Sequence, residues 1–524
     1  MNRTGMWLCR PNNMHTSDTI TATASAHGQG AIGVIRISGD DALCVLKKVF
    51  TPHRDFESHK IYYGKITSGA EIIDEVTACF FAAPRSFTRE NCVEIYAHGG
   101  MFVLSEILNL LVKNGARLAE PGEFTKRAFL NGRINLAEAE AVMDLISAKT
   151  SAARRAAVRQ LGGGLSRKIE DARDTILSWI AHIELSIDYP EHEDEARNAA
   201  EILAECDALL ETLRGIHATS GTGRIIRDGI RTAIIGRPNV GKSTLLNAIL
   251  REDRAIVHET AGTTRDILTE QVRIGDIALL LTDTAGLRQT SDEVEKIGIE
   301  KTLDTARDAE LILYVADATA GITPEDAEKI ADFEQPVIIL FNKCDLMITG
   351  ASPGVMPHEL FEKSSTKTNA GDTCNLPHIP SKPDTAPCTI NETAQSAVSE
   401  NFFEEGVRGR NFFSKKSFSP EVLNISAKTG DGLTELFACI KEIFIKHGAD
   451  GAETEIITRE RHGVLLAQAI EHIEGAAREL HAGVPEDLVS VSLRAAYIAL
   501  GEILGAEIGD DIVDRIFEEF CLGK

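Results

Sequence analysis

The chain has 524 residues, a hydrophobic content of 43% and a net charge of −24. This length suggests about three or four domains, because a typical domain has roughly 150 residues. No apolar run approaches the roughly 18 residues that cross a bilayer, and the negative charge argues against indiscriminate binding to nucleic acid or acidic membranes. The 10 cysteines show no CxxC pair, which favours reduced thiols. We therefore expect a cytoplasmic protein without a membrane partner, beginning with an untargeted extension at residues 1–16.

The first part of the chain predicts an α+β domain followed by helices. Residues 17–133 contain short β-rich runs between glycine-rich turns, with one helical segment. From 134 to 228 the apolar residues recur at helical spacing, as in Leu136, Ala139 and Met143. Long helices of an α-helical domain are expected there.

The second part predicts an α/β domain and then more helices. In residues 229–447, apolar strands alternate with helical stretches, which is typical of a doubly wound parallel sheet. Residues 448–524 return to helical periodicity. We favour one helical domain interrupted by the α/β domain, and two separate helical domains remain an alternative. The stretch 348–418 is rich in Ser, Thr, Pro and Asn, so we expect an insert that is mostly disordered.

The strongest motif is a phosphate-binding loop. Residues 236–243 read GRPNVGKS, after an apolar strand and before a helix, which is the context such a loop needs. Its glycines allow backbone N–H groups to converge on phosphates, its lysine adds charge at the β- and γ-phosphates, and its serine offers a hydroxyl to Mg²⁺. The expected nucleotide contacts are Asn239, Val240, Gly241, Lys242, Ser243 and Thr244.

Two further motifs fit the γ-phosphate and its metal ion. Thr263 and Thr264 follow about twenty residues later, where a switch loop places Thr264 on Mg²⁺. The sequence DTAG then closes a strand, which places a carboxylate near the metal and a glycine near the γ-phosphate. Its residues are Asp283, Thr284, Ala285 and Gly286.

Guanine recognition is predicted from two motifs that follow the last two strands. The carboxylate of Asp345, in NKCD, can accept hydrogen bonds from N1–H and the 2-amino group of guanine, neither of which adenine offers. SAK completes the base pocket. The expected contacts are Asn342, Lys343, Asp345, Ser426, Ala427 and Lys428. The ordered set predicts a GTPase domain of the Ras-like, P-loop class.

The hydrolytic machinery is less constrained by the sequence. The amide oxygen of Asn239 could ligate a cation beside the phosphates, or the side chain could only brace the turn. After DTAG come Arg288 and a cluster of acidic residues, one of which could orient the attacking water. Each is also compatible with a simple solvated charge. The acidic residues are Asp292, Glu293 and Glu295.

Beyond the GTPase motifs, the chain resembles the MnmE (TrmE) family of tRNA-modification GTPases. The likeness covers nearly the whole chain apart from the first fifteen or so residues and 348–418. The N-terminal segments and an end of the form Cys-x-Gly-Lys separate this family from other Era-like GTPases. The segments are SDTI, GAIGVIRISG, SFTRENCVEIYAHGG, PGEFTKRAFLNGRINLAEAEAVMDLI, GRPNVGKSTLLNAIL, AGTTRD, DTAGLRQTSDEVEKIGIE and FCLGK.

The resemblance implies a multidomain protein. Its parts are an α+β folate-binding N-terminal domain that makes the homodimer, an α-helical domain, and an inserted G domain whose K⁺-dependent dimerisation triggers hydrolysis. The family works with the FAD-containing protein MnmG, as a heterotetramer. Together they place a carboxymethylaminomethyl or aminomethyl group on C5 of the wobble uridine of certain tRNAs.

The family's functional residues carry over one position at a time. Arg36, Glu94, Arg133 and Lys524 match contacts to 5-formyltetrahydrofolate or a related one-carbon folate, although Arg133 stands where the family has lysine. Glu295 matches the catalytic glutamate that positions water. The residues matching the K⁺ ligands are Asn239, His258, Thr260 and Thr263, on a GTP-binding loop that also contains Glu259, Ala261 and Gly262.

The end of the chain carries a separate expectation. Cys521 matches a motif cysteine that the family needs for modification and not for hydrolysis, and a packing role is the alternative. The helix predicted at 510–520 should dock this tail through Ile512, Ile516 and Phe520.

A second functional class is also possible. A ribosome-assembly GTPase of the Era type would share the G motifs, but no basic KH-type GxxG segment follows the G domain and the tail is acidic. Any tRNA must meet local basic patches on this acidic chain, and solvated helix faces are the alternative interpretation of such patches. The candidates are Lys126, Arg127 and Arg133, and Arg154, Arg155 and Arg159.

Overall fold

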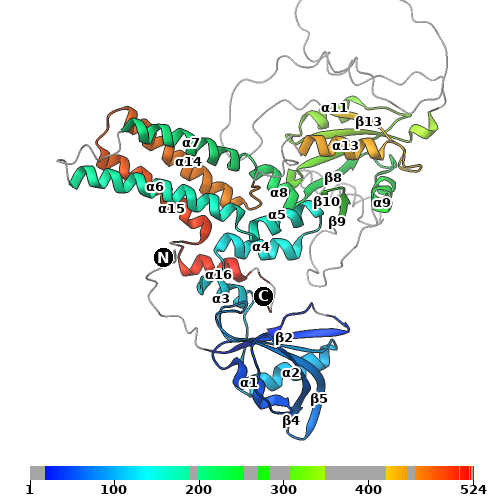
Figure 1. The fold of residues 1–524 in the computed structure, drawn as a ribbon. Coiled ribbons are helices and arrows are strands. Elements are labelled where there is room, and N and C mark those ends of the chain that lie inside the picture. The colour runs from blue at the N-terminus through cyan, green and yellow to red at the C-terminus, as the bar shows by residue number, and fades with distance from the viewer. Residues whose placement is uncertain are drawn as a thin grey trace, which may run out of the picture. The chain divides into compact units, whose positions relative to one another are not determined.

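The computed structural model describes most of the chain (Figure 1). It contains two compact units, which we describe separately. Unit 1 comprises Met1–Ser147, Ala157–Gly215 and Arg461–Lys524, and unit 2 comprises Ala148–Ala156 and Ile216–Glu460. The predicted extension at 1–16 and insert at 348–418 lie outside the described residues. The described residues are 18–26, 28–188, 199–252, 269–283, 307–347, 420–444, 455–506, 508–518, 520 and 523.

Unit 1 begins with a seven-stranded sheet in the order β3-β4-β5-β6-β2-β1-β7. Its neighbours are antiparallel except for β1 and β7. Two helices, α1 (Ala42–Val49) and α2 (Met101–Lys113), pack against it through a shared apolar core. This is the α+β arrangement expected from the sequence. The strands are β1 (Ile20–Thr23), β2 (Ile32–Ser38), β3 (Phe50–Thr51), β4 (Ile61–Ser68), β5 (Glu71–Phe81), β6 (Cys92–His98) and β7 (Arg117–Leu118).

Strand alternation decides which side chains face away from that core. In β2, Ile35 and Ile37 are fully buried, and Arg36 between them points to the opposite face. In β6, Val93 and Ile95 are buried likewise and Glu94 lies between them. Because Arg36 and Glu94 are partners in the β2–β6 register, they share that opposite face.

The rest of unit 1 is helical. Helix α6 packs against α15, α4 against α15, and α16 against α3. The last contact is close, since a Cβ atom on Gly122 (φ +70°) would lie 2.4 Å from the carbonyl oxygen of Phe517. Helices from before and after the nucleotide-binding segment therefore share one unit. They are α3 (Glu123–Leu130), α4 (Leu136–Ser147), α6 (Gly164–Asp188), α7 (Ala199–His217), α14 (Glu460–His481), α15 (Glu486–Leu504) and α16 (Asp510–Glu518), while α5 (Ser151–Leu161) falls partly in unit 2.

Unit 2 is built on a six-stranded sheet in the order β13-β12-β11-β8-β10-β9. All neighbours are parallel except β9 and β10. This matches the doubly wound sheet predicted from the sequence. The strands are β8 (Ile230–Gly236), β9 (Thr269–Ile274), β10 (Ile277–Asp283), β11 (Leu311–Asp317), β12 (Val337–Asn342) and β13 (Glu421–Asn424).

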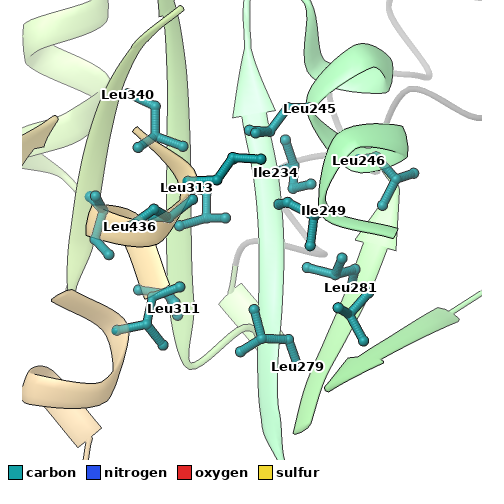
Figure 2. Close-up of a cluster of buried hydrophobic side chains, with 14 of the residues drawn as sticks. Ile234, Leu245, Leu246, Ile249, Leu279, Leu281, Leu311, Leu313, Leu340 and Leu436 are labelled. Carbon is teal, nitrogen blue, oxygen red and sulfur yellow. The ribbon is translucent and has the colours of Figure 1, made fainter. Parts of the chain in front are cut away.

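Helices cover both faces of this sheet. The larger core joins the strands to α9 (Lys242–Glu252) and α13 (Leu433–Phe444), and Figure 2 shows Ile234, Leu245 and Leu436 within it. A smaller cluster around Ile330 of α11 (Pro324–Ala331) covers the opposite face. Burial on both faces explains why the strands are continuous apolar runs. Among the helices that the structure describes, none has the length and apolarity needed to cross a membrane.

One boundary differs from the sequence-based expectation. Helix α8 (Ser220–Asp228) and residues 455–460 belong to unit 2, although the sequence placed them in the helical domain. Ile225 of α8 is part of the core of the six-stranded sheet. A Cβ atom on Gly223 would lie 1.9 Å from the carbonyl oxygen of Ile457, so the two segments touch through their backbones.

Candidate functional site

The phosphate-binding loop connects the end of β8 to the start of α9. A Cβ atom on Gly236 would lie 2.2 Å from the carbonyl oxygen of Val315 in β11, and Gly241 has φ +102°. Between them, Asn239 adopts φ +63°, a left-handed conformation that asparagine tolerates better than most residues. Only glycine fits at the two ends of this loop, as its motif requires.

Lys242 lies across the mouth of the loop. Its Nζ donates to the carbonyl oxygens of Gly236 at 2.8 Å and Arg237 at 2.7 Å. The exposed Ser243 and Thr244 follow in the first turn of α9, which contains no acidic residue. Free N–H groups at a helix N-terminus and a nearby ammonium group are suited to binding phosphate.

Asn342 joins the phosphate loop to both base-recognition loops. It is buried, and its Nδ2 donates to the carbonyl oxygen of Val240 at 2.8 Å. Its Oδ1 accepts from the backbone N–H of Ala427 at 2.9 Å. Ser426 donates through its hydroxyl to Asp345 Oδ1 at 2.7 Å, which fixes the carboxylate in place. Lys428, the last residue of this set, is exposed.

Lys343 makes a second connection between these loops. Its Nζ donates to the carbonyl oxygen of Asn239 at 3.0 Å and to Asp317 Oδ2 at 2.6 Å. Burial alone would raise the pKa of Asp317, but hydrogen bonds from Lys343 and Thr319 outweigh it and hold that pKa below its usual value. Asp317 was not predicted as a site residue, although an acidic residue ending a buried strand was a usable signal.

Of the remaining predicted nucleotide and metal residues, the structure describes Asp283 and Ser243. The backbone of Asp283 ends β10 beside Ile234 of β8, which puts this residue at the same edge of the sheet as the phosphate loop. The predicted Mg²⁺ ligand Ser243 is at the start of α9. Lying outside the described residues are His258, Glu259, Thr260, Ala261, Gly262, Thr263, Thr264, Thr284, Ala285, Gly286, Arg288, Asp292, Glu293 and Glu295.

Unit 1 contains a cavity of about 590 Å³ on the sheet face opposite its helices. Arg36, Glu94 and Arg133, all predicted to bind folate, line it together. Arg36 donates to Glu94 Oε1 through Nε at 3.1 Å and through a terminal nitrogen at 2.9 Å. Tyr96 donates to Glu94 Oε2 at 2.6 Å. Residues separated by almost a hundred positions thus form one polar site.

Phe87 belongs to the apolar part of the same cavity, together with Phe81 and Pro84. The guanidinium carbon of Arg36 lies 4.9 Å from the centre of its ring, and that of Arg133 lies 4.7 Å from it. Arg133 also donates to the carbonyl oxygen of Phe87 at 2.7 Å. Burial, together with the charges of Arg36 and Arg89, lowers the pKa of Arg133. Sequence reasoning missed Phe87, and its position within the family segment SFTREN was the available signal.

The C-terminal tail docks onto the same sheet. A Cβ atom on Gly523 (φ +88°) would lie 2.1 Å from the carbonyl oxygen of Thr23. Thr23 ends β1, the strand paired with the part of β2 that carries Arg36. Cys521 and Lys524 themselves lie outside the described residues.

The face of α16 that docks is only partly the predicted one, since Ile516 packs against the core as expected and Ile512 does not. Ile512 is 55% exposed, whereas Phe520 is buried as expected. The buried positions before it are Val513 and Phe517, one residue further along than the predicted pair. The sequence offers apolar residues on both faces, and the close approach of Gly122 to Phe517 selects one of them.

One proposed basic patch is also wrong. Arg127 is 4% exposed, because it is paired with acidic residues brought in by the fold. Lys126 pairs with Asp514. Arg127 is therefore neither a solvated charge nor available to a phosphate group. In the other patch, Arg155 pairs with Asp276 at 3.0 Å, and Arg154 is exposed. The partners of Arg127 are Asp18, Glu90 and Glu123.

Comparison with known proteins agrees with this geometry. A family model described as the GTP-binding protein TrmE N-terminus matches residues 19–133, and one described as the MnmE helical domain matches residues 136–521. The chain belongs to the MnmE family. It is therefore a GTP hydrolase involved in tRNA modification. The alternative of an Era-type ribosome-assembly GTPase is not supported.

The relatives match over nearly their whole length. The tRNA modification GTPase MnmE of Acetivibrio thermocellus is 40% identical over 517 residues, which covers 98% of this chain and 100% of the relative. That of Desulforamulus reducens is 39% identical over 516 residues, which covers 97% and 99%. Among solved structures, Era of Aquifex aeolicus with GDP and AlF4⁻ covers 46% of this chain and 66% of its own, at 23% identity and a TM-score of 0.25. A likeness this slight has no bearing on function.

Proposed function

We propose that this MnmE-family chain is the K⁺-stimulated, GTP-hydrolysing subunit of an enzyme that modifies C5 of the wobble uridine in tRNA. In this proposal it acts with the FAD-containing MnmG and adds an aminomethyl or carboxymethylaminomethyl group. The proposal that the chain binds GTP rests on one observation: the side chain of Asn342 links the phosphate loop to the base-recognition loops. Asp345, fixed by Ser426, is available to accept the N1–H and 2-amino groups of guanine.

The metal ions of this proposal would be held by oxygen atoms. The Ser243 hydroxyl, beside Lys242, is a ligand type that Mg²⁺ prefers, and Thr264 would be its second protein ligand. The side chain of the exposed Asn239 would ligate K⁺, while its own carbonyl oxygen is fixed by Lys343. The K⁺ ion would add positive charge beside the phosphates, and Glu295 would orient the attacking water. The remaining K⁺ ligands would be His258, Thr260 and Thr263.

The potassium requirement is tested by hydrolysis rates in KCl and NaCl at equal ionic strength. Wild-type protein should hydrolyse GTP much faster in K⁺, and Asn239→Ala should abolish the difference. Asn247→Ala, at an exposed asparagine on α9, is the matched control and should keep it. Equal rates in both salts for the wild type would refute potassium dependence.

We propose that the cavity of unit 1 binds 5-formyltetrahydrofolate or a related one-carbon folate. Its volume suits a small ligand. Glu94 accepts hydrogen bonds from Arg36 and Tyr96 and retains lone pairs for N–H groups of a pterin ring. Arg36 would hold Glu94 in position beside the pterin ring, and Arg133 and Lys524 would bind the carboxylates of the glutamate tail.

Calorimetry with 5-formyltetrahydrofolate tests this site. Glu94→Gln should weaken binding at least about tenfold, because a charge-assisted hydrogen bond contributes roughly 1.5–3 kcal/mol. GTP hydrolysis should be unchanged. Glu71→Gln removes an equal charge from an exposed position at the start of β5 and should leave folate affinity intact. If both variants bind alike, Glu94 is not a ligand.

We propose that Cys521 acts in modification and not in hydrolysis. The contact of Gly523 with Thr23, the last residue of the strand paired with β2, supports this proposal. In a deletion strain, Cys521→Ser protein should leave the wobble uridine unmodified, as measured by mass spectrometry of total tRNA, with normal GTPase activity in vitro. Full restoration of the modification would reassign Cys521 to packing.

We also propose the assembly that the family implies. The domain at 17–133 would form the homodimer, and two copies of MnmG would complete a heterotetramer. The G domain would be inserted between two segments of one helical domain. Light scattering of the chain alone and mixed with MnmG tests these stoichiometries. A monomer in isolation would exclude the dimer.

A further inference from the structure

The cavity of unit 1 contains more positive charge than the proposed ligand contacts account for. Arg36, Arg85, Arg89 and Arg133 line it, with Glu94 as the carboxylate among them. Glu94 pairs with Arg36 at 2.9 Å. Within the described part of the chain, no acidic group lies at ion-pair distance from the other three arginines.

Two of these arginines are held in place by carbonyl groups rather than by carboxylates. Arg89 donates to the carbonyl oxygen of Asn131 at 3.0 Å, and Arg133 donates to that of Phe87 at 2.7 Å. A carbonyl orients a guanidinium group without neutralising it. Burial and, after it, the neighbouring charges of Arg36 and Arg89 lower the pKa of Arg133.

The backbone of Arg89 has an unusual conformation at this position. It adopts φ +61°, in a region that residues with a Cβ atom rarely enter. Arg85 and Arg89 are exposed and lie in the connection between β5 and β6, whereas Arg36 and Glu94 lie on the sheet itself. The excess charge of Arg85 and Arg89 thus lies on an exposed connection, whereas the Arg36–Glu94 pair lies on the sheet.

This arrangement suits an elongated ligand with several carboxylates at one end. Folate with one glutamate has two carboxylates, and each additional γ-linked glutamate adds one more. We infer that the cavity selects polyglutamylated folate, with Arg89 and Arg85 binding the carboxylates beyond the first glutamate. This inference rests on the proposed folate site and specifies which form of folate binds there.

Calorimetry on the full-length protein compares 5-formyltetrahydrofolate carrying one glutamate and three glutamates. The triglutamate should bind about tenfold more tightly at low salt, because each exposed ion pair contributes up to roughly 1 kcal/mol. The gain should shrink at high salt. Arg89→Gly removes the charge and keeps a residue suited to the left-handed backbone. It should reduce the gain to about threefold or less and leave monoglutamate affinity nearly unchanged.

Arg54→Ala provides the matched control. Arg54 is an exposed arginine of the same domain that stacks on Tyr62, and it does not line the cavity. This variant loses the same charge and should keep the full tenfold gain.

The outcomes separate this inference from the folate proposal. Equal affinity of wild-type protein for both ligands overturns the polyglutamate specificity and leaves the folate site standing. Absence of binding to either ligand overturns the folate site and the inference with it. If Arg54→Ala reduces the gain as much as Arg89→Gly, the effect is general attraction and the role of Arg89 is refuted. Displacement of the triglutamate by tRNA in wild-type but not Arg89→Gly protein would assign the arginine to RNA phosphates instead.

Discussion

Gly241 shows how one residue supports the whole nucleotide site. A Cβ atom there would lie 2.2 Å from Nδ2 of Asn342, the atom that binds Val240. Any side chain at this position must displace Asn342. Because Asn342 also holds Ala427, the base-recognition loop would shift with it.

Gly241→Ala should therefore weaken GTP binding by at least about tenfold, since disturbing one buried hydrogen-bonding group costs roughly 1–3 kcal/mol. Titration with a fluorescent, non-hydrolysable GTP analogue measures the effect. Gly275→Ala is the control, because Gly275 also has a positive φ, +58°, but nothing lies within 4 Å of its Cβ position. It should cost stability and leave affinity within twofold or so. Equal losses in both variants would attribute the effect to backbone strain.

Among single residues, the sequence correctly predicted those whose role depends on local chain geometry. The glycines of the phosphate loop and Asn342 belong to short motifs, and the neighbouring residues of each motif determine their structural role. Arg127 was misjudged because its partners Asp18 and Glu90 are distant in sequence and only the fold brings them together. The pairing of Asp317 with Lys343 was missed for the same reason.

Among the elements, helices α4, α14 and α15 meet at a buried charged cluster. Glu140 of α4 is 2% exposed and accepts from Arg461 at 2.9 Å and from His462 at 2.7 Å. Arg461 also donates to the carbonyl oxygen of Glu502 in α15 at 2.8 Å. Burial alone would raise the pKa of Glu140, but the charges of His462 and Arg461 outweigh it and depress that pKa strongly.

A depressed carboxylate pKa makes this cluster sensitive to acid. Its stabilisation is complete above the pKa of an unfolded glutamate, about 4.3, and is lost as the pH falls towards the lower folded value. Glu140→Gln should destabilise the protein by roughly 1–3 kcal/mol at pH 7, because it weakens the hydrogen bonds that the buried carboxylate accepts from Arg461 and His462. The variant should also lose less stability than the wild type between pH 5 and 3.

Urea unfolding followed by circular dichroism at several pH values measures both effects. Glu471→Gln, at an exposed position on α14, is the control and should change stability by less than about 0.5 kcal/mol. An unchanged midpoint for Glu140→Gln at pH 7 would show that the cluster contributes nothing to stability.

Helical spacing predicted that α4 and α16 exist, but it did not determine how α16 is rotated. Apolar residues at 512 and 516 compete with those at 513 and 517, and a pattern on one helix cannot choose between two faces. Contact with α3 makes that choice. The alternation in β2 and β6 was more informative, because a strand has only two faces and the core occupies one of them.

For the whole molecule, the composition of residues 348–418 leads to a prediction about nucleotide affinity. Strands β12 and β13 flank this stretch and pair directly in parallel, and the loops that follow them are joined by the Ser426–Asp345 hydrogen bond. Replacing 348–418 with a short Gly/Ser linker should leave GTP affinity within a few-fold, since closure entropy depends only weakly on loop length. Loss of nucleotide binding would show that the segment supports the guanine pocket.

The tail contact between Gly523 and Thr23 has a consequence for how the protein is made. Translation proceeds at about 5–20 residues per second, so β1 leaves the ribosome roughly 25–100 s before the residue that docks onto it. Unit 1 also needs α14 to α16, whereas the sheet of unit 2 is complete once β13 has emerged. Unit 2 can therefore fold first. At that stage the end of β1 in the N-terminal sheet still lacks its contact with Gly523. A fragment ending at residue 460 and released from the ribosome should show protease-resistant unit 2 and a unit 1 that still engages chaperones.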